Sequence, residues 1–181
     1  MKAIIALSIH AQTRKCLISM PSSHKFSPDR FDIAILDIVQ ADNKTSLKTI
    51  AERVNLSTAA VQRRIRRLED EGVITRNIAV VDPNAVGQPI TIIVEVTTER
   101  THIEELDAMR ALLKAPEIQQ CYYVTGEADF VLVINVETME AYEALARKLF
   151  YENRNVKMFR SMVVLDRVKV GLGVDLSRTG D

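Results

Sequence analysis

Basic side chains gather in one short stretch of the chain, between residues 43 and 67. Seven lysines and arginines lie there against a single acid, Glu52, and four of the five arginines occupy positions 63, 64, 66 and 67. A local concentration of positive charge attracts phosphates. The guanidinium group in particular pairs bidentately with phosphate or guanine. This stretch is therefore a candidate nucleic-acid-binding element.

The residues from Ser57 to Glu71 have the spacing of a helix that carries these arginines, and Gly72 is a suitable stop. At 100° per residue, Val61, Ile65 and Leu68 form a narrow apolar stripe. The other side presents guanidiniums, an amide that can pair with adenine, and hydroxyls at the helix start that can contact phosphate. The predicted DNA-binding residues are Ser57, Thr58, Ala59, Gln62, Arg63, Arg64, Arg66 and Arg67.

Two further helices are predicted before this one. Ser27, Pro28 and Asp29 have the order of a helix start: a hydroxyl N-cap, proline at the first position, then an acid. Ser46 is the predicted cap of a second helix, and a turn at residues 55–57 separates it from the basic helix. A third helix behind a three-residue turn is the helix-turn-helix arrangement, which binds double-stranded DNA. DNA recognition is therefore favoured over the alternative of a merely solvated basic face.

The net charge of the whole chain is zero, with 24 basic and 24 acidic residues, and taken alone it argues against a nucleic-acid binder. The charges are unevenly distributed, however. Residues 1–25 hold four basic residues and no acid, residues 26–82 hold nine of each, and residues 83–181 hold eleven basic against fifteen acidic residues. The zero is a cancellation, and it does not exclude the basic helix as a DNA contact.

Composition and length limit the class of protein. The chain has 181 residues, 47% of them hydrophobic and 27% charged, which is typical of one or two globular domains. No apolar stretch approaches the ~20 residues of a membrane helix, and two cysteines cannot form a disulfide scaffold. We expect a cytoplasmic protein with no membrane partner. Residues 1–25 lack the pattern of a secretory signal and are expected to form a poorly structured extension.

The second half of the chain has a different pattern. A weak alternation at residues 73–81 predicts a strand that leaves a DNA-binding domain at 26–82, followed by a linker at 83–87. Strands are then expected at 89–98, 118–124, 129–136 and 156–170, with helices at 101–114 and 138–152. This β-α-β-β-α-β order is that of a ferredoxin-like domain, placed at 88–170 and followed by a tail at 171–181.

Oligomerisation follows from the expected sheet. Two helices cover only one face of a four-stranded sheet, whereas the strand at 129–136 has aliphatic residues on both sides. We therefore infer that a second subunit covers the open face. A homodimer also suits a helix-turn-helix protein, because two recognition helices match a pseudo-palindromic site.

Five stretches carry a more specific pattern. They are DRFDIAIL at 29–36, IAERVNLS at 50–57, VQRRIRRLEDEGVI at 61–74, VDPNAVG at 81–87 and VTGEADF at 124–130. In this order and spacing they resemble the Lrp/AsnC, or feast/famine, family of transcriptional regulators. The resemblance implies an α+β protein: an N-terminal winged helix-turn-helix joined to a ferredoxin-like effector and oligomerisation domain. It also implies dimers that assemble further, often into octamers, and an amino acid as effector.

The resemblance also implies an effector site. The family's Thr-Gly-x-x-Asp turn falls here on Thr125, Gly126, Glu127, Ala128 and Asp129. Such a turn offers backbone groups to an α-carboxylate and a side-chain carboxylate to an α-ammonium, although plain turn chemistry would select the same glycine and aspartate. By weaker analogy, Ser161 and Met162 of the last strand line the same pocket.

Two alternatives remain open. Haem-pathway decarboxylases resemble the same two-domain architecture, but such an enzyme is expected to use histidine. This chain has only His10, His24 and His102, so no catalytic residue, metal ligand or cofactor is predicted. The other alternative is an interaction module whose DNA-binding domain is vestigial. The sequence favours a DNA-binding regulator that responds to a small effector.

Overall fold

The computed structural model describes residues 26–99 and 114–177. The chain divides into two compact units, one that ends at Asn77 and also includes the residues from Leu172 onward, and one that spans Ile78–Gly171. The expected extension at 1–25 and nearly all of the expected helix at 101–114 lie outside the described residues.

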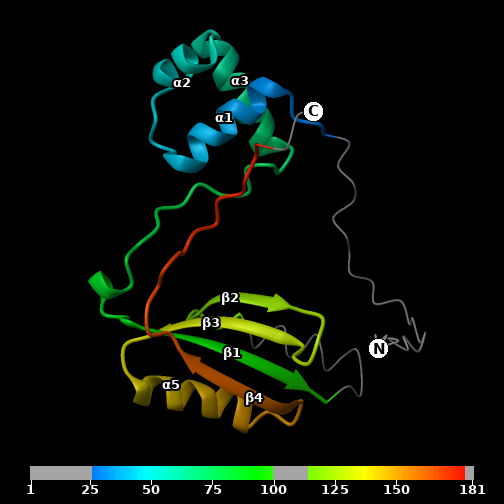
Figure 1. Ribbon diagram of the computed structural model, residues 1–181, viewed down its shortest axis with the longest axis vertical. Helices are drawn as coiled ribbons and strands as arrows, with labels where there is room; N and C mark the ends of the chain where they lie inside the picture. Colours follow the sequence, from blue (N-terminus) through cyan, green and yellow to red (C-terminus); the bar gives the residue numbers. More distant parts are fainter. Residues whose placement is uncertain (1–25, 100–113, 178–181) are drawn as a thin grey trace, which may run out of the picture. The chain divides into compact units, whose positions relative to one another are not determined.

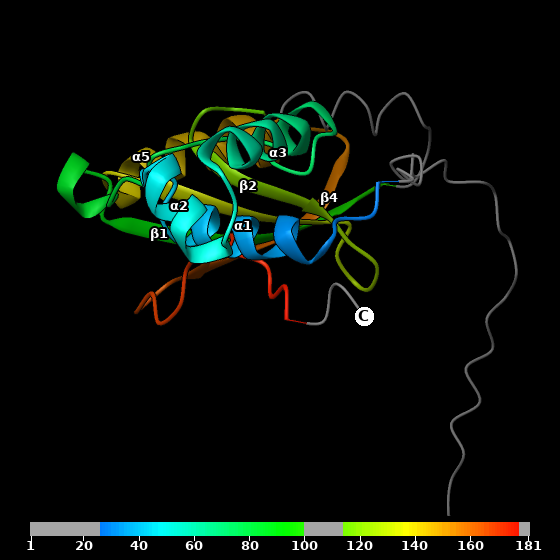
Figure 2. The ribbon, with the colours of Figure 1, turned by 90° about the horizontal axis from the view of Figure 1, so that it is seen from above.

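Three helices form the first unit: α1 (Arg30–Ala41), α2 (Leu47–Val54) and α3 (Thr58–Asp70). Each helix contacts the other two, as Figures 1 and 2 show. Every helix contributes fully or almost fully buried residues to one core, which includes Ile35, Ile50, Val61 and Leu68. The predicted tri-helical unit is confirmed, with α3 as the basic helix.

The start of α1 differs from the prediction. Its N-cap is Asp29, not Ser27, and the Asp29 carboxylate accepts hydrogen bonds from the N–H groups of Phe31 and Asp32 at 2.8 and 2.9 Å. The Asp32 carboxylate in turn accepts from the Asp29 N–H at 3.1 Å. A reciprocal pair of this kind satisfies more of the free N–H groups at a helix start than one hydroxyl does.

The turn before α3 has the expected conformation. Asn55 adopts the left-handed region with φ 53° and ψ 47°, which asparagine tolerates better than most residues. Beyond α3, Gly72 also has a positive φ of 71° and ends the helix. The strand predicted at 73–81 is wrong, however, because this segment is irregular.

The second unit is built on a four-stranded antiparallel sheet with the strand order β2-β3-β1-β4 (Figure 1). The strands are β1 (Ile90–Thr98), β2 (Ile118–Tyr123), β3 (Phe130–Val136) and β4 (Val156–Val163). Between β3 and β4 lie α5 (Met139–Ala146) and a π-helical turn, η2 (Arg147–Tyr151), and a short 3-10 turn, η1 (Asn84–Val86), precedes β1. This strand order is the one expected for the ferredoxin-like prediction.

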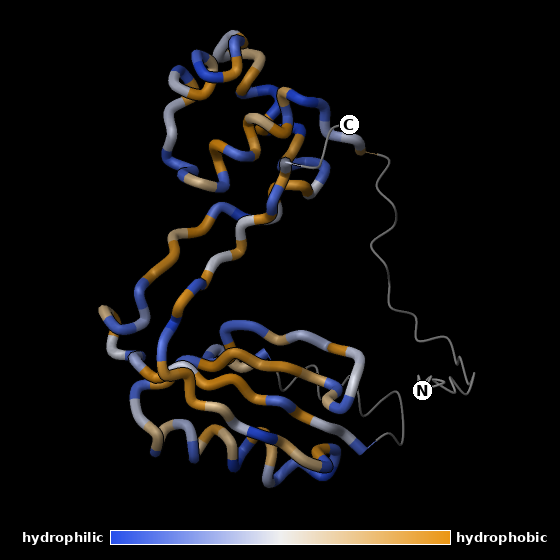
Figure 3. The backbone as a smooth tube through the Cα atoms, in the orientation of Figure 1, coloured by the Kyte–Doolittle hydropathy of each residue, from blue (hydrophilic) through white to orange (hydrophobic). Residues whose placement is uncertain are grey.

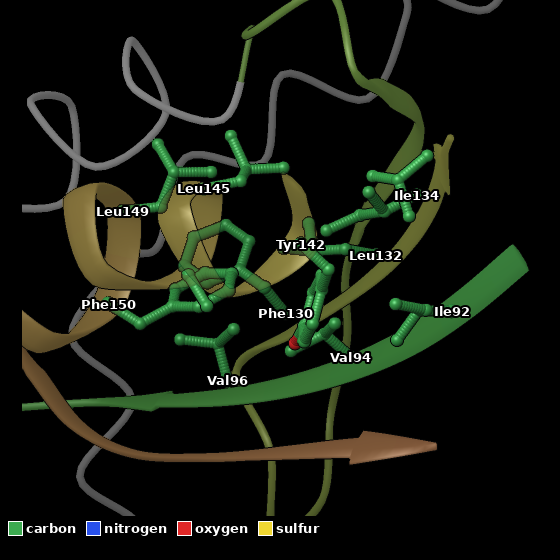
Figure 4. Packing of buried hydrophobic residues seen from close by; sticks show 12 residues of the cluster. Ile92, Val94, Val96, Phe130, Leu132, Ile134, Tyr142, Leu145, Leu149 and Phe150 are labelled. Carbon is green, nitrogen blue, oxygen red and sulfur yellow. The ribbon is translucent and has the colours of Figure 1, made fainter. Parts of the chain in front are cut away.

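One face of the sheet packs on α5. Alternate residues of the two central strands point to this face and are fully buried, among them Val94, Val96 and Leu132, together with Leu149 and Phe150 from the helical side (Figure 4). Figure 3 shows that β1 and β3 are largely hydrophobic along their length. The intervening residues of these strands belong to the opposite, open face.

The last strand is shorter than predicted. The apolar run continues to Val170, but β4 ends at Val163. Val163 pairs with Ile92, and the Val164 N–H donates to the Thr91 carbonyl at 2.9 Å. The neighbouring strand β1 begins at Ile90, so the residues after Val164 have no partner in the described sheet.

Candidate functional site

Helix α3 is fixed by its buried side, and its basic side faces solvent. Val61 and Leu68 are completely buried against α1 and α2. The predicted DNA-binding residues on the opposite side that the structure places in solvent are Ala59, Gln62, Arg63 and Arg66. The 100° spacing therefore predicted the orientation of the helix correctly.

The start of α3 is also open to a ligand. The Ser57 hydroxyl caps the helix by accepting from the Ala60 N–H at 3.2 Å, and both Ser57 and Thr58 are exposed. The N–H groups of a first helical turn, with the positive end of the helix dipole, favour phosphate groups. Ser57 and Thr58 are thus placed where backbone phosphate contacts are expected.

Two of the predicted arginines have partners inside the protein. Arg64 Nη1 donates to Asp29 Oδ2 at 2.8 Å and to Asp32 Oδ1 at 2.7 Å, and Arg67 Nη2 donates to Asp32 Oδ2 at 2.7 Å. The Asp32 side chain is 0% exposed, that of Arg64 24% and that of Arg67 49%. Asp32 therefore attaches α3 to α1 through two ion pairs.

Aromatic rings complete this attachment. The Arg64 guanidinium lies 5.4 Å from the Phe31 ring centre, and that of Arg67 lies 5.1 Å from the Phe26 ring centre. Both distances are within the range of cation–π attraction. Arg64 is consequently held by contacts within the unit, while the half-exposed Arg67 keeps one side open to solvent.

The attachment changes the pKa of both partners. Burial alone would raise the pKa of the Asp29 carboxyl, but hydrogen bonds from the Asp32 N–H and the Arg64 guanidinium bring it below its ordinary value. The hydrogen bond to Asp32 raises the pKa of Arg64 further. A carboxyl whose pKa is lowered by folding stabilises the fold above its unfolded pKa and loses that contribution as the pH falls through the folded value. The attachment through Asp29 is therefore intact at neutral pH and weakens only in acid.

Arg63 and Arg66 differ from this pair. Neither makes a hydrogen bond or ion pair with any residue in the described part of the chain, and both are exposed. They are the guanidiniums left free for an external ligand. The sequence analysis missed Asp32, although an acid inside the apolar run of a helix and three residues after another acid is a signal for such a partner.

The predicted effector turn lies between β2 and β3, and Asp129 anchors it. The Asp129 carboxylate is buried and accepts from the Thr98 N–H at 2.8 Å and from the Thr98 hydroxyl at 2.9 Å. The Asp129 N–H donates to the Val96 carbonyl at 2.9 Å, and the Thr97 hydroxyl donates to the Glu127 carbonyl at 3.2 Å. The turn is thereby fastened to the end of β1.

The other turn residues are presented outward. Thr125, Gly126 and Glu127 are exposed, and Ala128 is half-buried. Gly126 has φ 128°, a conformation that side chains other than glycine's rarely permit. The turn thus offers backbone groups and the Glu127 carboxylate to a ligand, whereas the Asp129 carboxylate has a structural role in addition to any contact with an effector.

Ser161 and Met162 do not join this turn within one chain. They are consecutive residues of the edge strand β4, so their side chains point to opposite faces of the sheet. The Ser161 hydroxyl shares a hydrogen bond with the Tyr142 hydroxyl of α5, in the lining of an open cavity of about 340 Å³. Met162 is 40% exposed and pairs with Ile93 of β1. A common pocket with the turn would need a second chain.

The anchoring role of Asp129 predicts a local effect. Replacing Asp129 with alanine removes the acceptor of the Thr98 N–H, and a hydrogen bond to a charged group contributes about 1.5–3 kcal/mol. We expect the Thr98 amide to exchange its hydrogen roughly ten to a hundred times faster, because local opening becomes easier. Amide hydrogen exchange of the full chain measures this. Glu127→Ala, which leaves the backbone contacts intact, is the control, and equal exchange in both variants would contradict the anchoring role.

Two kinds of feature were sought among the residues that the structure describes. No three His, Cys, Asp or Glu side chains there are grouped as ligands of a metal ion would be. None of the helices in this part of the chain has both the length and the apolarity needed to span a bilayer.

Comparison with known proteins assigns both units. A family model described as the Lrp/AsnC ligand binding domain matches residues 91–174, and one described as a winged helix-turn-helix DNA-binding domain matches residues 28–75. An HTH-type transcriptional regulator of Sinorhizobium fredii, itself uncharacterised, is 42% identical over 149 residues, which are 82% of this chain and 88% of the relative. The leucine-responsive regulatory protein of Escherichia coli K12 is 32% identical over 142 residues, 78% of this chain and 87% of that protein.

Solved structures agree with this assignment. A transcriptional regulator of Neisseria meningitidis in complex with L-Met superposes with a TM-score of 0.77 at 26% identity, over 82% of this chain and 97% of that one. An AsnC family regulator of Agrobacterium tumefaciens gives the same TM-score and the same coverage at 30% identity. Fold, basic helix and sequence similarity thus lead to one conclusion: this chain is a member of the Lrp/AsnC family of DNA-binding transcriptional regulators, and not an enzyme.

Proposed function

We propose that this protein is a sequence-specific regulator whose operator affinity or state of assembly responds to an amino acid bound at the turn of residues 125–129. The observation that carries the DNA-binding part is the outer face of α3. Arg63 and Arg66 are exposed and free of internal partners there, while Val61 and Leu68 on the other side fix the helix in its unit. Guanidiniums in this setting read guanine or contact phosphate.

The chemistry of the turn supports an amino-acid effector. Its exposed backbone and the Glu127 carboxylate can hold an α-carboxylate and an α-ammonium, and Asp129 keeps the turn in place through Thr98. Relatives are named for such molecules: the leucine-responsive regulatory proteins, and the glutamate uptake regulatory protein of Zymomonas mobilis, which is 34% identical over 122 residues. The Neisseria meningitidis structure is a complex with L-Met. The identity of the effector here is open among the amino acids.

The open face of the sheet supports a homodimer, and the family resemblance supports further assembly, such as an octamer. Ile93 and Val133 lie side by side on that face, and Met162, next to Ile93 on β4, is 40% exposed. The segments that flank the sheet also expose apolar residues, including Val80 and Val168 at 87% and 88%. Burying such surface against a second copy is favoured by about 25 cal/mol per Å².

A thermal-shift screen with the twenty amino acids tests the effector proposal. A ligand that binds only the native state raises its melting temperature, with about 2.7 kcal/mol of stabilisation at a hundred times its dissociation constant. We expect one or a few L-amino acids to do so and their D-enantiomers not to. Gly126→Ala, strained at φ 128°, is expected to lose the shift. No shift with any of the twenty would refute an amino-acid effector.

The same preparation serves for DNA and assembly. Light scattering during gel filtration, with and without the amino acid that gives a shift, measures the oligomer. A gel shift with DNA from upstream of the protein's own coding region measures operator binding. Binding there supports a regulator, and the lack of binding to that DNA and to any duplex selected from a random pool would favour the interaction-module alternative.

A further inference from the structure

The C-terminal segment returns to the DNA-binding unit. Gln40 Nε2 of α1 donates to the Val174 carbonyl at 2.8 Å, and the Val174 N–H donates to Gln40 Oε1 at 3.0 Å. A single side-chain amide therefore pairs with both polar groups of one backbone residue. Leu176 packs on the helical core and is half-buried. The segment Leu172–Ser177, named here the docked segment, is part of the fold of this unit.

The docked segment contacts the same helix that holds α3. Gln40 lies in the last turn of α1, and Asp32 in its first turn makes the ion pairs to Arg64 and Arg67. Docking therefore acts on the recognition helix through α1 and not by direct contact with DNA. In the described structure, neither Gln40 nor the docked segment belongs to the exposed arginine face of α3.

Docking also gives the chain two connections between its units. One consists of the residues from Ile78 to β1, and the other consists of residues 164–171, between the end of β4 and the docked segment. A unit tied by one flexible connection samples many orientations, whereas a second attachment closes a loop and removes many of them. Two DNA-binding units that must reach two half-sites together depend on this range of orientations.

We infer that the docked segment determines which spacing of operator half-sites the protein accepts, with Gln40 as the positioning residue that holds it. This inference rests on the proposed function, namely on a dimer that binds paired half-sites. With the segment docked, few orientations are available and only one spacing is bound tightly. With the segment released, the first connection alone restricts the units, and altered spacings are tolerated.

The test compares half-site spacings in the full-length protein. Duplexes selected from a random pool by the wild-type protein are lengthened or shortened between their half-sites in steps up to half a helical turn. We expect the wild type to lose about tenfold or more in affinity for the altered duplexes, and Gln40→Ala to lose only about threefold or less, with similar affinity for the parent duplex. A second variant ends the chain after Gly171 and is expected to behave as Gln40→Ala does.

Two controls separate the outcomes. Gln119→Ala changes an exposed glutamine of β2 in the other unit and is expected to keep the wild-type penalty for altered spacing. Exchange of the Val174 amide hydrogen reports release of the segment in Gln40→Ala. A full spacing penalty in the truncated chain would overturn the inference, as would a full penalty in Gln40→Ala with fast Val174 exchange. Failure of the wild type to select any duplex would instead refute the proposed function.

Discussion

Replacing Asp32 with alanine is expected to lower the free energy of unfolding of the helical unit by about 3 kcal/mol, near the lower end of the ~3–5 kcal/mol found when one partner of a buried ion pair is removed. The Asp32 side chain is 0% exposed and accepts from both Arg64 and Arg67. Its loss leaves two guanidiniums without their partner. Both are partly exposed and can be rehydrated, which is the reason for the lower end of the range.

Asp32→Asn and Asp37→Ala show whether charge is the cause. The asparagine keeps the shape and an acceptor oxygen but loses the negative charge, so we expect an intermediate loss. Asp37 is an exposed aspartate of the same helix, and its replacement should change stability by no more than about 0.5 kcal/mol. Urea unfolding, with hydrogen exchange in α1 and α3 to identify the unit, gives the three values. Equal stability of Asp32→Ala and Asp37→Ala would refute the role of the ion pairs.

Local signals in the sequence predicted most of the helical unit. The apolar stripe of Val61, Ile65 and Leu68 is sufficient to orient α3, since a regular helix repeats its direction every 100°. Ser46, Asn55 and Ser57 act where their side chains satisfy or reverse the backbone next to them. Such effects depend only on neighbours in the chain, so a single sequence contains them.

Contacts between distant residues were not predictable in the same way. Arg64 meets Asp32 across a separation of 32 residues, and Gln40 meets Val174 across 134. Whether an arginine faces DNA or an internal carboxylate depends on how two helices cross, which spacing along one helix does not contain. The end of β4 has a similar cause: the apolar alternation continues, but the partner strand does not.

The predicted effector site shows the same limit. The turn at 125–129 was recognisable as a local motif, and the structure adds the anchor from Asp129 to Thr98. Ser161 and Met162 lie on opposite faces of another strand, so their place in the site depends on how chains associate. The sequence of one chain carries little direct information on that association.

Removing both free guanidiniums of α3, in Arg63→Ala combined with Arg66→Ala, is expected to weaken operator binding about a hundredfold or more. Each base-reading or phosphate contact contributes about 1–3 kcal/mol, and 1.4 kcal/mol corresponds to a tenfold change. Neither arginine has an internal partner among the described residues, so the melting temperature should stay close to that of the wild type. A titration of labelled operator DNA measures the loss.

The salt dependence of binding then separates the roles of the two residues. An arginine on a phosphate lowers the slope of log affinity against log salt concentration by about one when it is removed, and it weakens all sequences alike. An arginine on a guanine relaxes the preference at one base pair instead. Arg154→Ala, an equal charge change at an exposed position of the other unit, controls for net charge. If the double variant bound the operator as tightly as Arg154→Ala does, α3 would not be the recognition helix. Arg64→Ala offers the opposite contrast: because Arg64 is committed to Asp29 and Asp32, its removal should reduce stability more than it reduces the affinity of the folded protein.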